Sequence, residues 1–184
     1  MIIRKATQRD AKEIAFCMLL AMEDIVYTFI GENSTEKALT FLESLIIQKS
    51  NQYSYENCWV IESDNKVIAA ANLYDGADLK QLRKPVALLL KTRFNQELTY
   101  EDETQSGEYY IDCIGVNPSH QGKGIGSRIL SFLIDEYVHK KKKTLGLLVD
   151  KENPNAKKLY LKLGFKIVGE KRLAGKVMEH LQIH

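Results

Sequence analysis

The sequence has little net charge, few cysteines and no long apolar run, and each of these absences excludes a class of protein. Its 26 Lys and Arg residues nearly balance 24 Asp and Glu residues, which leaves a formal charge of +2. Proteins that bind nucleic acid usually carry a concentrated basic stripe, so we expect no nucleic-acid partner. No window reaches the apolar length that a membrane-spanning helix needs, so we also expect no membrane partner.

The cysteines are also uninformative about a disulfide framework. Cys17, Cys58 and Cys113 are an odd number, and they form no CxxC pair and no cluster with histidine. They fit reduced, buried thiols.

The first residues reach charge at once and lack the apolar stretch of a signal peptide. We therefore expect a cytoplasmic protein.

The length and composition are typical of one globular domain. The 184 residues are 45% hydrophobic and 27% charged, values close to those of ordinary globular proteins. A chain of this size can bury a core without disulfides or metal. We find no internal repeat or linker, so we predict a single domain over residues 1–184.

Patterns of apolar residues predict the order of elements. Strands are expected at 2–5, 58–63, 66–74, 109–116, 145–149, 166–172 and 176–183. Helices are expected to begin near 11 and 34 and to span 124–140 and 155–163. A strand, a crossover helix and a strand within 109–149 form a βαβ unit, so these two strands are parallel and the others antiparallel. Residues 77–104 are the hardest to interpret and predict a helix plus a mobile loop.

A glycine-rich segment, Gln121-Gly122-Lys123-Gly124-Ile125-Gly126, lies between a predicted strand and a predicted long helix. Consecutive backbone N–H groups there can converge on an anion, and glycines let the backbone approach a phosphate closely. Three basic residues can add positive charge: Lys123, Arg128 and Lys157. A P-loop would need Ser or Thr where Gly124 stands, and a dinucleotide fingerprint would need glycine at Ser127. The segment predicts a phosphate cradle of another kind, with a plain strand-to-helix turn as the alternative.

Two segments together resemble one known family. Val116-Asn117-Pro118, followed by Gln121 to Ser127, resembles the acetyl-CoA signature of GNAT N-acetyltransferases. Residues 153–165 read Asn-Pro-Asn-Ala-Lys-Lys-Leu-Tyr-Leu-Lys-Leu-Gly-Phe, similar to that family's later Asn-x-x-Ala-x-x-x-Tyr-x-x-x-Gly-Phe segment. The two matches, in this order and with a strand between them, are far more specific than either alone. The resemblance covers Tyr110 to Phe165 in motif detail and the whole chain in element order.

The resemblance implies a fold of the α/β (α+β) class. It predicts a mixed, mostly antiparallel sheet of about six to seven strands with a splayed parallel pair, flanked by about four to five helices. The strand that ends at Val116 and the strand at Leu145–Val149 would part and admit the pantetheine arm of acetyl-CoA. The pyrophosphate would then lie on the glycine-rich segment, and no metal would be required.

The resemblance also implies which residues contact the coenzyme. Backbone groups near the end of the first splayed strand would bind pantetheine, and Asn153 would contact it, although Asn153 could also be a simple helix cap. The predicted binding set is Ile114, Gly115, Val116, Gln121, Gly122, Lys123, Gly124, Ile125, Gly126, Ser127, Asn153 and Lys157.

Acylation of an amine needs a base, because an alkylammonium has no lone pair at neutral pH. We predict that Asp112 accepts the proton through water, since strand alternation places it on the same side as Tyr110, Ile114 and Val116. Its match to the family's acidic base is approximate, and an Asp that orders a neighbouring loop is the alternative. The same alternation turns Cys113 to the opposite face, which favours direct attack over a covalent cysteine intermediate.

Tyr160 matches the family's general acid, which protonates the departing thiolate; a tyrosine that only packs its helix is the alternative.

The predicted function is acetyl transfer from acetyl-CoA to a primary amine of a small molecule or peptide. Glu23, Asp24 and Tyr27, and the acidic end of residues 77–104, could attract a cationic amine. O-acetylation, a longer acyl-CoA, and a non-catalytic coenzyme A sensor remain alternatives, and the sequence leaves a homodimer open.

Overall fold

The computed structural model describes residues 1–184, which form a seven-stranded sheet in the order β1-β2-β3-β4-β5-β7-β6. All neighbouring strands pair antiparallel except β4 and β5. The predicted mixed sheet with one parallel pair is therefore confirmed. The strands are β1 (Ile2–Lys5), β2 (Cys58–Ser63), β3 (Lys66–Asp75), β4 (Tyr109–Val116), β5 (Leu145–Asp150), β6 (Lys166–Leu173) and β7 (Lys176–Ile183).

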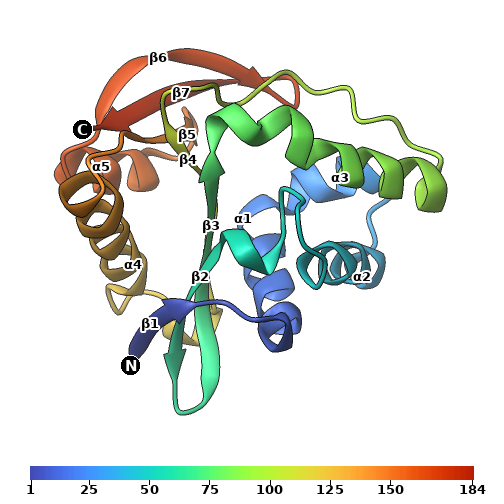
Figure 1. The fold of residues 1–184 in the computed structure, drawn as a ribbon, viewed down its shortest axis with the longest axis horizontal. Helices are drawn as coiled ribbons and strands as arrows, with labels where there is room; N and C mark the ends of the chain where they lie inside the picture. The colour runs from blue at the N-terminus through green and yellow to red at the C-terminus, as the bar shows by residue number, and fades with distance from the viewer.

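Helices cover both faces of the sheet, and each face has its own apolar core. Figure 1 shows α4 and α5 on one face and α1, α2 and α3 on the other. Beyond its end at Leu133, α4 continues as wider π-type turns from Ile134 to Lys140, so the long predicted helix is present with a change of pitch. The helices are α1 (Ala11–Ile30), α2 (Thr35–Ile46), α3 (Leu79–Phe94), α4 (Ile125–Leu133) and α5 (Pro154–Lys162).

Short local signals set several of these boundaries. Thr7 N donates to Asp10 Oδ2 at 2.7 Å as part of a capping box before α1. Ser34 caps α2 by accepting a hydrogen bond from Lys37 N. Asp64 and Asn65 both have positive φ, 52° and 59°, as the two-residue turn of the β2–β3 hairpin requires. No single helix is long and apolar enough to cross a membrane; residues 8–30 and 35–46 reach the required length and composition only as a pair bent by 96°.

A β-bulge in β4 changes which residues face the two cores. The register with β3 moves from Asn72↔Cys113 to Leu73↔Ile111, so Asp112 has no partner across the ladder. Cys113 consequently packs in the core beneath α1, on the same side as Asp112 and not opposite to it. The expectation from strict alternation was wrong on this point, because the extra residue shifts the side-chain period by one.

The same bulge corrects a second expectation. Ile114 and Val116 pack against the core beneath α4, on the other face from the Asp112 carboxylate. Tyr110, which precedes the bulge, lines the same cavity as Asp112, as alternation predicted.

The parallel strands β4 and β5 part soon after they begin. They pair only at Tyr109↔Leu145, Tyr110↔Gly146 and Ile111↔Leu147. Beyond Ile111, β4 stays beside β3 alone, and the rest of β5 stays beside β7 alone. The splayed pair that the family resemblance predicted is therefore present.

Gly115 lets α1 approach the splayed part of β4. A Cβ at this position would lie 1.8 Å from the carbonyl oxygen of Cys17, a backbone atom that cannot move without shifting α1. We expect Gly115→Ala to lower the free energy of unfolding by about 3 kcal/mol, the upper range for overpacked cores. Urea denaturation measures this, with Gly126→Ala as the control, because a Cβ at Gly126 meets nothing within 4 Å. Equal midpoints for the two variants would contradict the close approach.

Candidate active site

A cavity of about 390 Å³ lies where β4 and β5 part. Asp112 from β4, Asn153 from the start of α5 and Tyr160 from α5 all line it, so the structure brings together three residues that the sequence predicted. The helix α1 borders the same cavity and is kinked there, since Met22 has non-helical torsions of φ −142° and ψ 34°. The cavity therefore reaches from the splayed strands to the helices on the opposite side.

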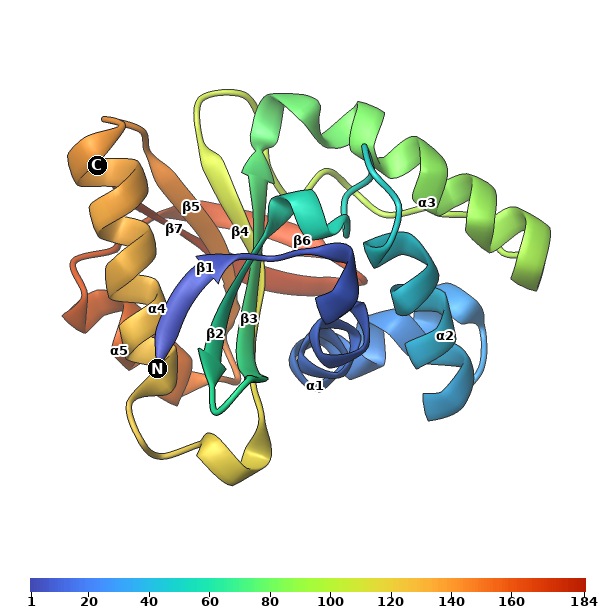
Figure 2. The ribbon, with the colours of Figure 1, turned by 60° about the horizontal axis from the view of Figure 1, so that its bottom comes forward.

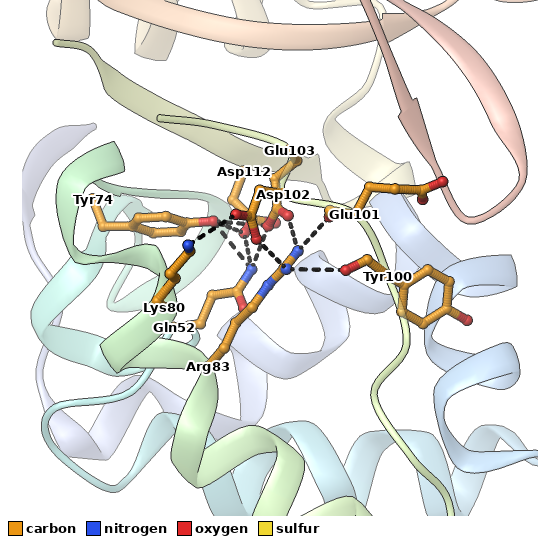
Figure 3. A network of polar contacts seen from close by, with 9 residues as sticks. All are labelled: Gln52, Tyr74, Lys80, Arg83, Tyr100, Glu101, Asp102, Glu103 and Asp112. Atoms are coloured by element: carbon orange, nitrogen blue, oxygen red, sulfur yellow. Dashed lines mark hydrogen bonds and ion pairs between the residues drawn. The ribbon is translucent and has the colours of Figure 1, made fainter. Parts of the chain in front are cut away.

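The Asp112 carboxylate is held by neutral donors through one of its two oxygens. Gln52 Nε2 and Tyr74 OH each donate to Asp112 Oδ2 at 2.8 Å (Figure 3). Asp112 Oδ1 receives no hydrogen bond from within the chain. Burial raises the pKa of Asp112, although the two hydrogen bonds and the charge of Arg83 oppose the rise. A carboxylate with a raised pKa and one open oxygen is suited to accept a proton.

Tyr160 remains a phenol over a wide pH range. Burial raises the pKa of Tyr160 above its ordinary value of 10.0. Its ring meets Phe165 edge to face, with 5.9 Å between the ring centroids, and its hydroxyl makes no hydrogen bond within the chain. The hydroxyl can therefore donate to a group bound in the cavity.

Cys113 shares this cavity but is poorly suited to act as a nucleophile. Burial raises the pKa of the Cys113 thiol well above its ordinary value, so the reactive thiolate is scarce at neutral pH. Direct attack by the acceptor on the donor thus remains the favoured chemistry, although the face predicted for Cys113 was wrong.

The glycine-rich segment forms an open turn at the start of α4. Gly122 and Gly124 have φ of +72° and +75°, which side chains rarely allow. A Cβ at Gly122, Gly124 or Gly126 would meet nothing within 4 Å, and no side chain caps the helix. The N–H groups of Ile125 and Ser127 and their neighbours are therefore free to bind an anion at the positive end of α4. Figure 2 shows this turn beside the open end of β4.

Other predicted coenzyme residues lie between this turn and the cavity. Gln121 Nε2 donates to Val116 O at 3.0 Å, which ties the turn to the end of β4. The edge of β4 from Asp112 to Val116 that faces β5 has no strand partner, so Ile114 and its neighbours present unpaired backbone there. Lys123 Nζ bonds Ser119 O at 2.9 Å.

Asn153 and Lys157 each have a partner within the chain. Asn153 Oδ1 accepts a hydrogen bond from Ala156 N at 3.1 Å and so caps α5, while the residue also lines the cavity. The Lys157 ammonium lies 2.8 Å from Glu179 Oε1 on β7. The structure thus gives Lys157 a carboxylate partner within the chain.

No three His, Cys, Asp or Glu side chains gather in a way that could hold a metal ion.

An acidic hollow of about 600 Å³ adjoins the cavity and shares part of its wall. Glu23 and Asp24 from α1 line it together with Asp150 and Glu152, and Lys176 pairs with Asp150 at 3.1 Å. Carboxylates therefore outnumber cations at this opening. The predicted Tyr27 instead donates a hydrogen bond to Glu23 Oε1 at 2.8 Å and does not line the hollow.

The sequence did not identify the partners of Asp112. Tyr74 ends a predicted strand, and the register that places it beside β4 depends on the unpredicted bulge. Gln52 lies in a turn that carries no motif. Arg83 and Glu103 fall within residues 77–104, where only the surplus of acidic residues gave a signal.

Comparison with known proteins adds a family to this geometry. A model of the acetyltransferase (GNAT) family matches residues 24–165. The spermine/spermidine N(1)-acetyltransferase of Bacillus subtilis (strain 168) is 32% identical over 72 residues, 39% of this chain and 47% of the relative. N-alpha-acetyltransferase RimI of Mycobacterium tuberculosis (strain ATCC 25618 / H37Rv) is 40% identical over 65 residues, 35% of this chain and 39% of the relative. The chain therefore spans about half the length, or less, of the curated relatives it matches.

Solved structures match over almost the whole chain. An acetyltransferase crystal structure shares 32% identity, covers 99% of this chain and 98% of that protein, and superposes with a TM-score of 0.83. An N-acetyltransferase from Staphylococcus aureus Mu50 has a TM-score of 0.89 at 24% identity over 100% of both chains. The yncA protein of Salmonella typhimurium, solved with its cofactor acetyl-CoA, has a TM-score of 0.55 at 19% identity over 100% of this chain and 93% of that one. At 24% and 19% identity, the last two similarities show a shared fold.

Proposed function

The chain belongs to the acetyltransferase (GNAT) family, and on that basis we propose that it transfers an acetyl group from acetyl-CoA to a primary amine of a small molecule or peptide. One observation carries the proposal. Asp112, which can take a proton, and Tyr160, which can give one, line a single cavity at the gap between β4 and β5. The open turn at the start of α4 lies beyond the end of the same strand.

The coenzyme would bind along this line of features. The pyrophosphate would accept hydrogen bonds from the backbone of residues 122–127, where glycines leave room for it. The pantetheine arm would pair with the open edge of β4 at Ile114 to Val116, and the Asn153 amide would contact it. The thioester would then reach the cavity between Asp112 and Tyr160. Lys123 belongs to the same turn, and its ammonium would add positive charge to the pyrophosphate site.

The proposed reaction moves two protons. The acceptor enters as an ammonium ion and gives one proton to the Asp112 carboxylate, directly or through one water. The free amine attacks the acetyl carbon, the carbon–sulfur bond breaks, and Tyr160 protonates the sulfur to give the thiol. The second proton of the attacking nitrogen restores the Tyr160 hydroxyl, so the net products are the amide, coenzyme A and one proton.

The environment of Cys113 supports protonation of the leaving sulfur in this cavity. Burial that raises the pKa of the Cys113 thiol penalises any thiolate formed in the same surroundings. A departing thiolate would therefore hold a proton more strongly there than in water. Burial also raises the pKa of Tyr160, so phenolate and thiolate are both disfavoured there, and the Tyr160 proton should pass to sulfur as the attacking nitrogen returns one to the Tyr160 oxygen.

The charge around the cavity supports a cationic acceptor. Four carboxylates and one cation, Lys176, line the adjoining hollow, and Asp112, Glu103 and Arg83 line the cavity itself, so carboxylates are in excess in both. Carboxylates arranged in this way raise the local concentration of cations and attract an ammonium group before it loses its proton. A neutral alcohol would not be attracted by this excess of negative charge, so we rank amines first.

Two measurements on the purified protein test the proposed function. Isothermal titration should show acetyl-CoA binding, and a thiol-release screen should give turnover with polyamines, aminoglycosides or peptide amines in preference to neutral alcohols. Binding without thiol release across the whole panel would instead favour a coenzyme A sensor. Thiol release that is faster with alcohols than with amines would reassign the acceptor class.

A further inference from the structure

Glu103 lies beside Asp112 in the cavity, although it belongs to the segment between α3 and β4. Gln52 Nε2 is 2.8 Å from Asp112 Oδ2 and 2.9 Å from Glu103 Oε1. Tyr74 OH is 2.8 Å and 3.1 Å from the same two oxygens (Figure 3). Two carboxylates therefore share the same two neutral donors.

The donors cannot satisfy both carboxylates equally. The Gln52 amide nitrogen carries two protons and can donate one to each carboxylate, but the Tyr74 hydroxyl carries one proton and can serve only one at a time. Arg83 forms an ion pair with the other oxygen of Glu103, whose side chain is 4% exposed. Arg83 also pairs with Asp102 at 3.1 Å, and Lys80 lies 4.0 Å from Asp102. With Asp102, Glu103 and Asp112 all ionised, three carboxylates face two cations, so one negative charge has no partner. One added proton, or one bound ammonium group, removes that imbalance.

We infer that Asp112 and Glu103 act as one proton-accepting pair, in which Asp112 takes the acceptor's proton and Glu103 sets how strongly Asp112 holds it. This inference rests on the proposed acetyl transfer. The charge of Glu103 favours protonation of Asp112, because two nearby carboxylates resist being ionised together. The ion pair with Arg83 keeps Glu103 itself ionised, so the proton goes to Asp112 and not to Glu103. Asp112 takes the proton and Glu103 does not, because the Arg83 guanidinium contacts Glu103.

The tyrosine and cysteine side chains around the pair add no charge at neutral pH. Burial raises the pKa values of the surrounding tyrosines and of Cys113, so these groups stay neutral. Arg83 is the cation that contacts the pair, and Lys80 lies further out, 4.0 Å from Asp102. The titratable and charged groups around the pair are Tyr53, Tyr74, Arg83, Tyr110 and Cys113, together with Asp102, which contacts Arg83 at 3.1 Å.

Glu103 is held in place from both sides. On one side, Arg83 Nη2 donates to Glu101 O at 3.0 Å and Arg83 Nη1 to Tyr100 O at 3.4 Å. On the other, Thr104 Oγ1 donates to the buried Glu108 at 2.7 Å, and His180 Nε2 lies 2.8 Å from the same carboxylate. The segment that the sequence predicted as a mobile loop is thus tied to α3 and to β7.

Two substitutions should move the titration of Asp112 in opposite directions. Glu103→Gln removes a negative charge and leaves Arg83 paired with Asp102 alone, so the acidic limb of kcat/KM should move to lower pH by about one unit. Arg83→Gln removes a positive charge and should move the limb to higher pH, and Arg83→Lys should return it toward the wild-type position. Thiol release with acetyl-CoA and spermidine measures these limbs. Glu101→Gln, the same charge change on an exposed side chain of the same segment, is the control and should leave the limb in place.

A second readout needs no acceptor. Infrared difference spectra of the ligand-free protein follow the carboxylic acid band of Asp112, identified by its loss in Asp112→Asn. This band should titrate at lower pH in Glu103→Gln and at higher pH in Arg83→Gln. If neither variant moves the band, the pair is refuted. If the band moves as expected but no amine on the panel releases thiol, the pair stands and the proposed acetyl transfer fails.

Discussion

Asp112→Asn is expected to lower kcat/KM for acetyl transfer by about 10²- to 10⁴-fold at neutral pH, the range that a positioned general base contributes. Asparagine keeps the size of the side chain and can still accept the hydrogen bonds from Gln52 and Tyr74, but it cannot take a proton. The acidic limb that protonation of Asp112 gives the wild type should disappear. Because burial raises the pKa of Asp112, that limb lies at higher pH than an ordinary aspartate would give.

The remaining activity of Asp112→Asn should recover as the pH approaches the pKa of the acceptor, about 10 for an alkylamine, because the free amine then needs no base. Thiol-release rates from pH 5 to 10 measure both effects. A variant that keeps the wild-type pH profile would remove Asp112 from the role of base.

The stability of the same variant separates a chemical effect from a folding defect. The folded chain raises the pKa of Asp112 above the unfolded value, so ionisation costs the folded state stability as the pH rises through that interval. Asparagine removes this cost. The Tm of Asp112→Asn at pH 7 is therefore expected to equal or exceed that of the wild type in a calorimetric scan, and a large drop would attribute lost activity to folding.

The sequence predicted those parts of the molecule that depend on local patterns. Apolar periodicity placed the strands and most helices, and the Asp64-Asn65 turn and the Ser34 cap marked their boundaries. The family resemblance added the splay of β4 and β5, which no single strand encodes. Tyr160 and Asp112 were named from these signals, and the structure places both in one cavity.

The rest depends on contacts between distant segments. The bulge at Asp112 arises from the pairing of β4 with β3, and β4 alone reads as a regular strand, so the sides of Cys113, Ile114 and Val116 were assigned wrongly. Glu103 lies beside Asp112 in a segment that Arg83 ties to α3 and Thr104 ties to the buried Glu108. The proton-accepting pair is a property of tertiary structure, and spacing along the chain could not indicate it.

Tyr160→Phe tests the other end of the proposed proton path. Loss of the hydroxyl should lower kcat by about 10²-fold or more, because the thiolate must then leave without a positioned proton donor in surroundings that disfavour its charge. Phenylalanine keeps the edge-to-face contact with Phe165, so the position of α5 should not change. Isothermal titration should therefore give an unchanged Kd for acetyl-CoA. Tyr55→Phe, a substitution outside the cavity, should leave both quantities as in the wild type.

The two kinetic constants decide between a catalytic and a packing role for Tyr160. A proton donor acts only after the coenzyme is bound, so its loss lowers kcat and kcat/KM together. A tyrosine that merely shapes the wall of the cavity would weaken acetyl-CoA binding and leave kcat largely intact. Because the pKa of Tyr160 is raised above 10.0, its donor form persists from neutral pH to beyond pH 10. One cavity can therefore hold a working base and a working acid at the same pH. The kcat/KM of a double variant that carries both Asp112→Asn and Tyr160→Phe would measure how far the two roles depend on each other.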